Sequence, residues 1–293
     1  MRVLILGGGG MLGHRLSRAW QNDFEVWATY RRPVSDYQKY SLMEQSHQIG
    51  SIDVEQPAVI ETMIKQIKPD VVVNCVGLVK QREHGQRRTL SAVNALFPHL
   101  LASYCYENEC RLIHISTDCV FSGRKGFYTE QDSPDPVDEY GMSKLLGEPL
   151  MPHVLTLRTS LIGWELNHFT SLLEWFAAQR GKTIKGYRKA LFSGFTTQAI
   201  APLLAQIMLK EPAISGLYHL ASAPINKFDL LQTCIEQFKW HDINLIADDS
   251  FSIDRSLNGK KLDAIMGWRT PTWTAMIDDL YQDWSWYEKS RIG

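Results

Sequence analysis

The chain has 293 residues, of which 44% are hydrophobic and 22% are charged, and its 31 basic and 32 acidic side chains leave a formal net charge of -1. This composition is typical of a folded globular protein and offers no broad basic surface for nucleic acid. No apolar run approaches the ~20 residues needed to cross a bilayer, so we expect a cytoplasmic protein that does not enter the membrane.

The first predicted unit is a strand, a glycine turn and a helix. An apolar run at 3–6 ends at Gly7, and apolar residues recur at helical spacing from Met11 onward. Gly7, Gly10 and Gly13 form the pattern G-x-x-G-x-x-G at this junction. Glycine permits the tight turn and lets backbone amides approach a pyrophosphate, which the helix N-terminus also attracts. The pattern, at the start of a strand-turn-helix unit, predicts dinucleotide binding.

The second predicted strand, at 24–29, ends in a basic segment. Arg31 and Arg32 stand where folds that prefer NAD usually place an acidic residue for the ribose 2′-hydroxyl. A guanidinium suits a 2′-phosphate instead, which favours NADPH. NADH remains the alternative if both arginines are only surface charges.

Further apolar runs alternate with helix-length segments. Strands are expected at 70–75 and 111–115, and helices at 57–68 and 89–109. Strands that are apolar on both faces and alternate with helices indicate an α/β fold with a doubly wound parallel sheet of the Rossmann type. We assign this NAD(P)-binding domain to 1–155.

The regular alternation of apolar runs and helix-length segments ends in the second half, and we assign 156–293 to a smaller C-terminal α/β substrate region. It begins near the strand-like LTLR at 155–158, continues with an amphipathic stretch at 166–180 and with Gly- and Phe-rich loops, and ends in a Trp-rich helical segment at 272–289. Some of its segments are expected to return to the sheet. The tryptophans are expected to pack in the core, although an exposed part could support a homodimer.

A candidate catalytic group follows the strand at 111–115. Tyr140 and Lys144 are four residues apart, which on a helix places both side chains on one face. A nearby ammonium would lower the pKa of the tyrosine. Thr117 lies at the carboxyl end of the preceding strand, where ligands bind in open α/β sheets. We therefore expect Thr117 to orient a substrate carbonyl that Tyr140 protonates.

Metal chemistry is not expected. The five cysteines are an odd number without a C-x-x-C pair, which indicates reduced thiols, and the histidines are too widely spaced for a site.

At this point the chain resembles the extended short-chain dehydrogenases, and within them the dTDP-4-dehydrorhamnose reductase-like sugar-nucleotide reductases. The matching strings include VLILGGGGMLGHRL at the start, PDVVVNCVG at 69–77, RLIHISTDCVFSG at 111–123, YTEQDSPDPVDEYGMSKLLGE at 128–148 and RSLNGKKLDAIMGW at 255–268. The resemblance implies hydride transfer from NAD(P)H to the keto carbon of a nucleotide-linked deoxysugar, for a surface polysaccharide such as lipopolysaccharide. Tyr140 would be the general acid, and Lys144 would hold the nicotinamide ribose.

The resemblance also implies a set of binding residues. Cofactor contacts are expected at Gly7, Gly10, Met11, Leu12, Gly13, Arg31, Arg32, Asp53, Val54, Cys75, Val76, Gly77, Tyr140, Lys144 and Thr159. Substrate contacts are expected at Lys80, Thr117, Asp118, Cys119, Ser160 and Leu161. Rhamnose-forming enzymes usually have Tyr at the position of Cys119 and Trp at that of Leu161, so this chain could act on another sugar. The cations of the loop with Lys80 and Arg82 could meet a diphosphate or simply be exposed.

Dehydration, epimerisation and a regulatory role without catalysis are the alternatives to reduction. Related 4,6-dehydratases place Asp-Glu after the threonine, whereas this chain has Asp118-Cys119. Related epimerase-reductases carry a cysteine at the position of Asp118; Cys119 is one residue away and on an extended chain would point elsewhere. A non-catalytic, NADP-binding regulatory protein, like the subunit that accompanies methionine adenosyltransferase, is the third alternative, which the intact Thr117, Tyr140 and Lys144 disfavour.

Overall fold

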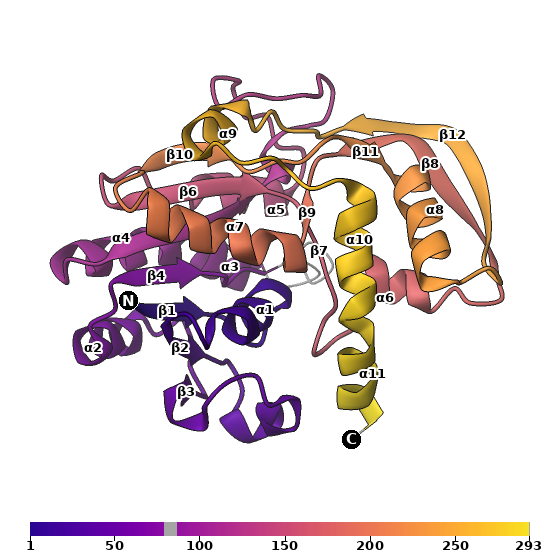
Figure 1. The fold of residues 1–293 in the computed structure, drawn as a ribbon. Coiled ribbons are helices and arrows are strands. Elements are labelled where there is room, and N and C mark those ends of the chain that lie inside the picture. The colour runs from indigo at the N-terminus through magenta and orange to yellow at the C-terminus, as the bar shows by residue number, and fades with distance from the viewer. Residues whose placement is uncertain (79–86, 293) are drawn as a thin grey trace.

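A computed structural model describes residues 1–78 and 87–292, and a parallel sheet forms its centre (Figure 1). The sheet has the order β10-β6-β5-β4-β1-β2-β3, and its neighbouring strands run parallel. Its strands are β1 (Arg2–Leu6), β2 (Glu25–Thr29), β3 (Gln48–Ile49), β4 (Val71–Asn74), β5 (Arg111–Thr117), β6 (Val154–Thr159) and β10 (Gly216–His219). The order reverses between β1 and β4, which is where open α/β sheets bind ligands.

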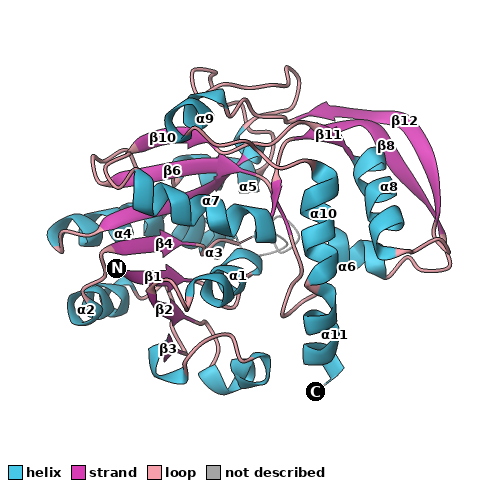
Figure 2. Ribbon diagram, viewed as in Figure 1, coloured by secondary structure: helices cyan, strands magenta, loops and turns pink. Residues whose placement is uncertain are grey.

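Helices cover both faces of this sheet (Figures 1 and 2). On one face α1 (Met11–Trp20) packs against α7 (Thr197–Lys210), and on the other α2 (Pro57–Ile67) packs against α4 (Phe97–Glu107). Alternate residues of β1 enter two different cores, Val3 and Ile5 one and Leu4 and Leu6 the other. Both faces are therefore buried, which explains why the strand reads as one apolar run.

The face with α2 and α4 also carries the elements that lead to Tyr140. These are α3 (Arg87–Leu90), the π-helical turn η4 (Ser91–Leu96), the 3-10 turn η5 (Asp118–Val120) and α5 (Glu139–Leu146). Two other 3-10 helices, η1 (Val34–Tyr40) and η2 (Gln45–His47), follow β2.

A second, three-stranded sheet lies to the right of the first in Figure 2. Its order is β11-β8-β12, and α8 packs against β8. The elements of this half are β7 (Leu161–Ile162), α6 (Leu172–Ala177), β8 (Thr183–Phe192), β9 (Phe195–Thr196), β11 (Ile225–Asn226), α8 (Lys227–Phe238), β12 (Asn244–Asp254), α9 (Lys260–Met266), α10 (Trp273–Gln282) and α11 (Trp284–Ile292).

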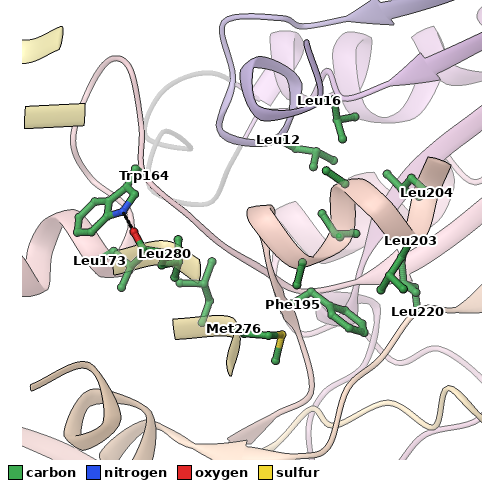
Figure 3. Close-up of a cluster of buried hydrophobic side chains, with 14 of the residues drawn as sticks. Leu12, Leu16, Trp164, Leu173, Phe195, Leu203, Leu204, Leu220, Met276 and Leu280 are labelled. Carbon is green, nitrogen blue, oxygen red and sulfur yellow. Dashed lines mark hydrogen bonds between the residues drawn. The ribbon is translucent and has the colours of Figure 1, made fainter. Parts of the chain in front are cut away.

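One apolar core connects the two sheets. Figure 3 shows Leu12 and Leu16 of α1 with Leu203 and Leu204 of α7, and nearby Met276 and Leu280 of α10. The Trp164 indole donates a hydrogen bond to the Leu280 carbonyl at 3.4 Å (Figure 3). The Trp-rich tail joins this core, as predicted. Trp273 is buried within the core, and the core is also contacted by three partly exposed tryptophans, Trp268, Trp284 and Trp286.

The predicted α/β class with a doubly wound parallel sheet is confirmed. The helix expected at 89–109 is confirmed as an unbroken helical run over 87–107 that includes the π-helical turn, whereas only Leu172–Ala177 of the stretch at 166–180 is helical. The expectation of loops after 180 is wrong where β8 forms, because an alternation of buried and exposed residues lets the apolar side of β8 pack on α8. Among the described residues, no helix is long and apolar enough to span a bilayer.

Candidate active site

The glycine turn after β1 is built so that backbone approaches backbone. Gly7 has a φ of +87°, which favours glycine, and a Cβ on Gly13 would lie 2.2 Å from the Gly7 carbonyl oxygen. The Gly8 amide donates to the Thr29 carbonyl at 2.7 Å, which joins the turn to the end of β2. No side chain caps the start of α1, where Gly10 is the N-cap residue. The turn therefore fits the pyrophosphate of a dinucleotide, as the glycine spacing predicts.

Three segments lie together on one side of the turn, where the adenine is expected: the turn itself at Gly7, the residues 75–76 after β4, and the residues 53–54. Gly7 approaches the segment after β4, since its Cβ would lie 3.2 Å from Val76 and 3.3 Å from the Cys75 backbone. Val54 and Val76 both pack against the core on the α2 and α4 face and against a smaller cluster of Leu78, Leu90 and Val93. The Asp53 carboxylate accepts a hydrogen bond from the Glu55 amide at 3.0 Å.

The expected nicotinamide side begins one residue further along the chain. A Cβ on Gly77 would lie 3.9 Å from the Lys144 Nζ and 3.5 Å from an Asn94 side-chain oxygen. The segment 75–77 therefore links the glycine turn to the face of α5 that carries Lys144. Burial raises the pKa of Cys75 to about 12, so its thiol stays protonated at neutral pH.

Lys144 is a buried cation. Its side chain is 4% exposed, and its ammonium donates to the Ile115 carbonyl oxygen at 2.7 Å. Burial lowers its pKa to about 8, and the negative charge of Glu148 partly opposes that shift. Its amine therefore loses its proton at a far lower pH than an ordinary lysine does.

Tyr140 lies one turn before Lys144 and is partly exposed. The Asp138 side chain caps α5 by accepting from the Gly141 amide at 2.8 Å, and a Cβ on Gly141 would lie 2.2 Å from the Cys119 carbonyl oxygen. The first turn of α5 therefore sits directly on η5. A hydrogen bond with Thr117, the last residue of β5, lowers the pKa of Tyr140.

The expected effect of Lys144 on the pKa of Tyr140 stays a prediction. In this structure burial of the ring raises the pKa of Tyr140, as do the negative charges that Cys119 and Asp118 can carry. Lys144 binds the Ile115 carbonyl. Tyr140 is therefore a protonated phenol at neutral pH, which suits a proton donor.

Asp118 and Cys119 follow Thr117 in the 3-10 turn η5, so the expectation of an extended chain at Cys119 is wrong. The Thr117 hydroxyl donates to Asp118 at 3.2 Å and accepts from the Cys119 amide at 3.1 Å. Burial raises the pKa of Asp118, opposed by the charges of Arg255 and Lys227. Burial likewise raises the pKa of Cys119 to about 12, and its sulfur accepts a hydrogen bond from Arg255 at 3.4 Å.

The end of β6 lies beside the end of β5. Thr159 is the register partner of Thr117, so it adjoins the candidate catalytic group. Ser160 and Leu161 continue toward the second half: the Ser160 carbonyl accepts from the Phe195 amide at 2.9 Å, and Leu161 pairs with Phe195 in β7 and β9.

The two arginines after β2 differ in their surroundings. Both side chains are exposed, but Arg32 lines a cavity of about 570 Å³ that Lys39 also lines, whereas Arg31 lies outside the lining. The remaining lining residues are Asp36, Tyr40, Leu166, Asn167, Phe169 and Glu174. Lys80 and Arg82 lie outside the described residues.

Two groups of buried polar side chains support this site, and their roles were not predicted from the sequence. Asn94, in the π-helical turn, donates to the Leu78 carbonyl at 3.0 Å and to Ser143 at 3.1 Å, and accepts from the Leu78 amide at 2.9 Å. Glu148 accepts from both Arg158, at 2.7 and 2.9 Å, and Ser116, at 2.6 Å. Both Asn94 and Glu148 lie in strings that resemble the family, VNALFPHLLA at 93–102 and the string at 128–148, but local sequence does not reveal their hydrogen-bond partners.

No metal centre is seen within 1–78 and 87–292, where no three His, Cys, Asp or Glu side chains gather in a way that could hold an ion. The five cysteines are free thiols.

Comparisons with known proteins agree on one family. The family described as RmlD substrate binding domain matches residues 1–285. A protein of Haloferax volcanii named "Probable low-salt glycan biosynthesis reductase Agl14" is 32% identical over 242 residues, which cover 76% of this chain and 75% of that protein. Methionine adenosyltransferase 2 subunit beta of Danio rerio is 27% identical over 260 residues, 84% of this chain and 76% of that protein.

A solved structure extends the similarity to the fold. The crystal structure of a hypothetical dTDP-4-dehydrorhamnose reductase from Sulfolobus tokodaii superposes with a TM-score of 0.75 at 26% identity. The match covers 93% of this chain and 97% of that chain. Both halves of the present structure are therefore included in the likeness.

Proposed function

Since this chain belongs to the RmlD substrate binding domain family, we propose that it is an oxidoreductase that uses NADPH to reduce the ketone of a nucleotide-linked 4-keto-6-deoxysugar. The observation that carries the proposal is the position of Thr117, Tyr140 and Lys144 around the carboxyl end of β5, connected to the glycine turn through 75–77. When bound, the reduced nicotinamide supplies the hydride that the keto carbon receives.

The side chains of the protein supply the proton that the ketone oxygen receives. Tyr140, whose raised pKa keeps it protonated, donates its proton to the ketone oxygen as the carbon is reduced, so that C=O becomes CH–OH, and solvent then restores the phenol. The Thr117 hydroxyl orients the same oxygen. The Lys144 ammonium holds the ribose next to the reacting carbon and offsets the negative charge left on Tyr140.

NADPH is favoured over NADH by the basic side chains after β2. Arg32 and Lys39 line one cavity at the end of this strand, where the adenine ribose is expected, and a 2′-phosphate would receive charge-assisted hydrogen bonds from them. No carboxylate occupies the first two positions after Thr29, which are Tyr30 and Arg31. An acidic residue there would select the 2′-hydroxyl of NADH instead.

The sugar side of the site is proposed to lie between the two halves. Cys119 and Leu161 are smaller than the Tyr and Trp usual in the rhamnose-forming enzymes, which favours a sugar other than the rhamnose precursor. The product would serve a surface polysaccharide such as lipopolysaccharide, and the enzyme would work in the cytoplasm. In this proposal 1–155 binds the cofactor and 156–293 binds the sugar nucleotide, although β10 of the second part completes the main sheet.

Two alternatives make different predictions. Similarity to methionine adenosyltransferase 2 subunit beta favours a regulatory subunit that binds the cofactor without turnover, but such a subunit needs neither the proton donor Tyr140 nor the carbonyl-orienting Thr117. Epimerisation would need a base next to the ketone, and the Cys119 thiol, whose pKa is about 12, is a poor one at neutral pH.

A direct assay separates these readings. NADPH absorbance is followed while the protein meets a panel of nucleotide-linked 4-keto-6-deoxysugars, with Tyr140→Phe in parallel and Tyr106→Phe, at a 65% exposed position, as the matched control. The proposal expects consumption by wild type and Tyr106→Phe and a loss of about 100-fold or more in Tyr140→Phe. Tight NADPH binding without consumption on any sugar would support the regulatory alternative.

A further inference from the structure

We propose that Tyr287 of the C-terminal helix α11 is a positioning residue for the cofactor turn, acting through His14 of α1. This inference rests on the proposed function, because the turn that it positions is the one assigned to NADPH. Tyr287 and Gly10 are 277 positions apart in the sequence, yet a single imidazole connects them. Its two hydrogen bonds determine how it can act.

His14 is fully buried and uses both ring nitrogens. Its Nδ1 lies 2.7 Å from the Gly10 carbonyl oxygen, and its Nε2 lies 2.7 Å from the Tyr287 hydroxyl. The Tyr287 side chain is 1% exposed, and the two rings meet edge to face at 5.7 Å. Neither hydrogen bond is therefore exposed to competing water.

These contacts allow one arrangement of protons. Burial lowers the pKa of His14 to about 4, so the ring is neutral at pH 7 and carries a single N–H. The Gly10 carbonyl can only accept, so Nδ1 carries the proton and Nε2 accepts from the Tyr287 hydroxyl. The Gly10 carbonyl thereby fixes the tautomer, and the Tyr287 hydroxyl, as the donor to Nε2, holds the ring in the orientation that binds Gly10.

The orientation of the Gly10 carbonyl matters because of peptide geometry. The carbonyl of Gly10 and the amide of Met11 belong to one planar trans peptide unit, so they point in opposite directions. The Gly10 carbonyl is held twice, by the His14 ring and by the His14 amide at 3.1 Å. Both bonds draw it toward the helix interior and so direct the Met11 amide out of the helix end, where an anion would bind.

The rest of α11 is fastened to α1 at the same place. Asp283, just before α11, accepts two hydrogen bonds from Arg18 at 3.1 and 3.2 Å and one from Gln198 at 3.1 Å. The Arg18 guanidinium also lies 3.6 Å from the centre of the Trp286 ring. The contacts of Arg18 lie about two turns along α1 from Gly10, and that of Gln198 comes from α7; together they keep Tyr287 in register with His14.

The test measures NADPH binding, which does not depend on the identity of the sugar. Tyr287→Phe removes only the hydroxyl, and we expect the Kd for NADPH to rise about 3-fold to 10-fold, the size of one lost hydrogen bond. Tyr281→Phe on α10, at a 39% exposed position, is the matched control and should bind as wild type does. In a His14→Phe background, Tyr287→Phe should weaken binding no further.

A second readout works without cofactor. The ring nitrogen shifts of His14 should report the Nδ1–H tautomer with a hydrogen-bonded Nε2 in wild type, and an Nε2 shift changed by the loss of that hydrogen bond in Tyr287→Phe. A wild-type Kd in Tyr287→Phe, an Nε2–H tautomer in wild type, or an equal loss in the His14→Phe background would overturn the inference. A wild type with the Nδ1–H tautomer that binds no NADPH would leave the positioning intact and refute the proposed function instead.

Discussion

The ammonium of Lys144 lies 2.7 Å from the carbonyl oxygen of Ile115. This bond ties α5 to β5 two residues before Thr117, so the helix that carries Tyr140 and the strand end that carries Thr117 are held at a fixed separation. It also places a buried positive charge beside 75–77, where a dinucleotide on the glycine turn would continue. The same burial makes the charge of Lys144 unusually sensitive to pH.

Turnover should fall on the alkaline side as Lys144 loses its proton. Burial lowers its pKa to about 8, so the ammonium is present below that pH and disappears above it, whereas Tyr140, with a raised pKa, remains protonated. We expect kcat/KM, which reports the free enzyme, to decline above about pH 8. In Lys144→Arg, whose guanidinium keeps its charge, activity is expected to be lower but its alkaline decline should shift upward. An identical decline in both proteins would exclude Lys144 as the titrating group.

The buried ion pair between Glu148 and Arg158 should be important for stability. The two side chains are 7% and 3% exposed, and Glu148→Gln would leave the Arg158 charge buried without a counter-ion. We expect the free energy of unfolding to fall by about 3–5 kcal/mol, measured by urea denaturation. Asp249→Asn, which breaks the half-exposed ion pair with Arg188, is the matched control and should cost at most about 1 kcal/mol. Equal losses in the two variants would contradict this account.

Gly13 should tolerate no side chain. The Cβ of Gly13→Ala would lie 2.2 Å from the Gly7 carbonyl oxygen and 2.8 Å from its carbon, so the backbone of the turn must move. We expect a loss of about 1–3 kcal/mol in unfolding free energy together with impaired NADPH binding. For stability, Gly10→Ala is the control, because its Cβ would meet the same oxygen only at 3.3 Å. Wild-type stability in Gly13→Ala would show that the turn can relax.

Cofactor preference should depend on Arg32 more than on Arg31. Because Arg32 lines the cavity with Lys39 and Arg31 does not, Arg32→Ala is expected to reduce the ratio of NADPH to NADH affinity by about 10-fold or more. The measurement is the Kd of each cofactor for both single variants and the double variant. An unchanged ratio in the double variant would remove the basis for NADPH.

The first half of the fold could be predicted because burial on both faces leaves a simple pattern. The strand at 70–75 is a run of valines, and the structure places β4 inside it. In β12 most side chains are exposed, so a sequence such as NLIADDSFSID carries little apolar signal. That strand forms because it pairs with β8 along most of its length, a partner that local sequence does not reveal.

The candidate site divides in the same way. The glycines, Thr117, Tyr140 and Lys144 stand at spacings that local geometry explains. Asn94 gives no such signal, because its role arises only where the π-helical turn meets Leu78 and Ser143. His14 also gives no signal in the sequence, because its partner Tyr287 lies on α11 at the other end of the chain.

Transfer of deuterium from the cofactor to a sugar would show directly that the protein reduces a sugar-nucleotide ketone. The protein is incubated with NADPH that carries deuterium at the transferable position and with the panel of 4-keto-6-deoxysugar nucleotides, and the sugars are analysed by mass spectrometry and NMR. We predict one deuterium at the former keto carbon of a product, absent or about 100-fold slower with Tyr140→Phe. Bound NADPH with no deuterium in any sugar, or transfer that is as fast in Tyr140→Phe, would contradict the account.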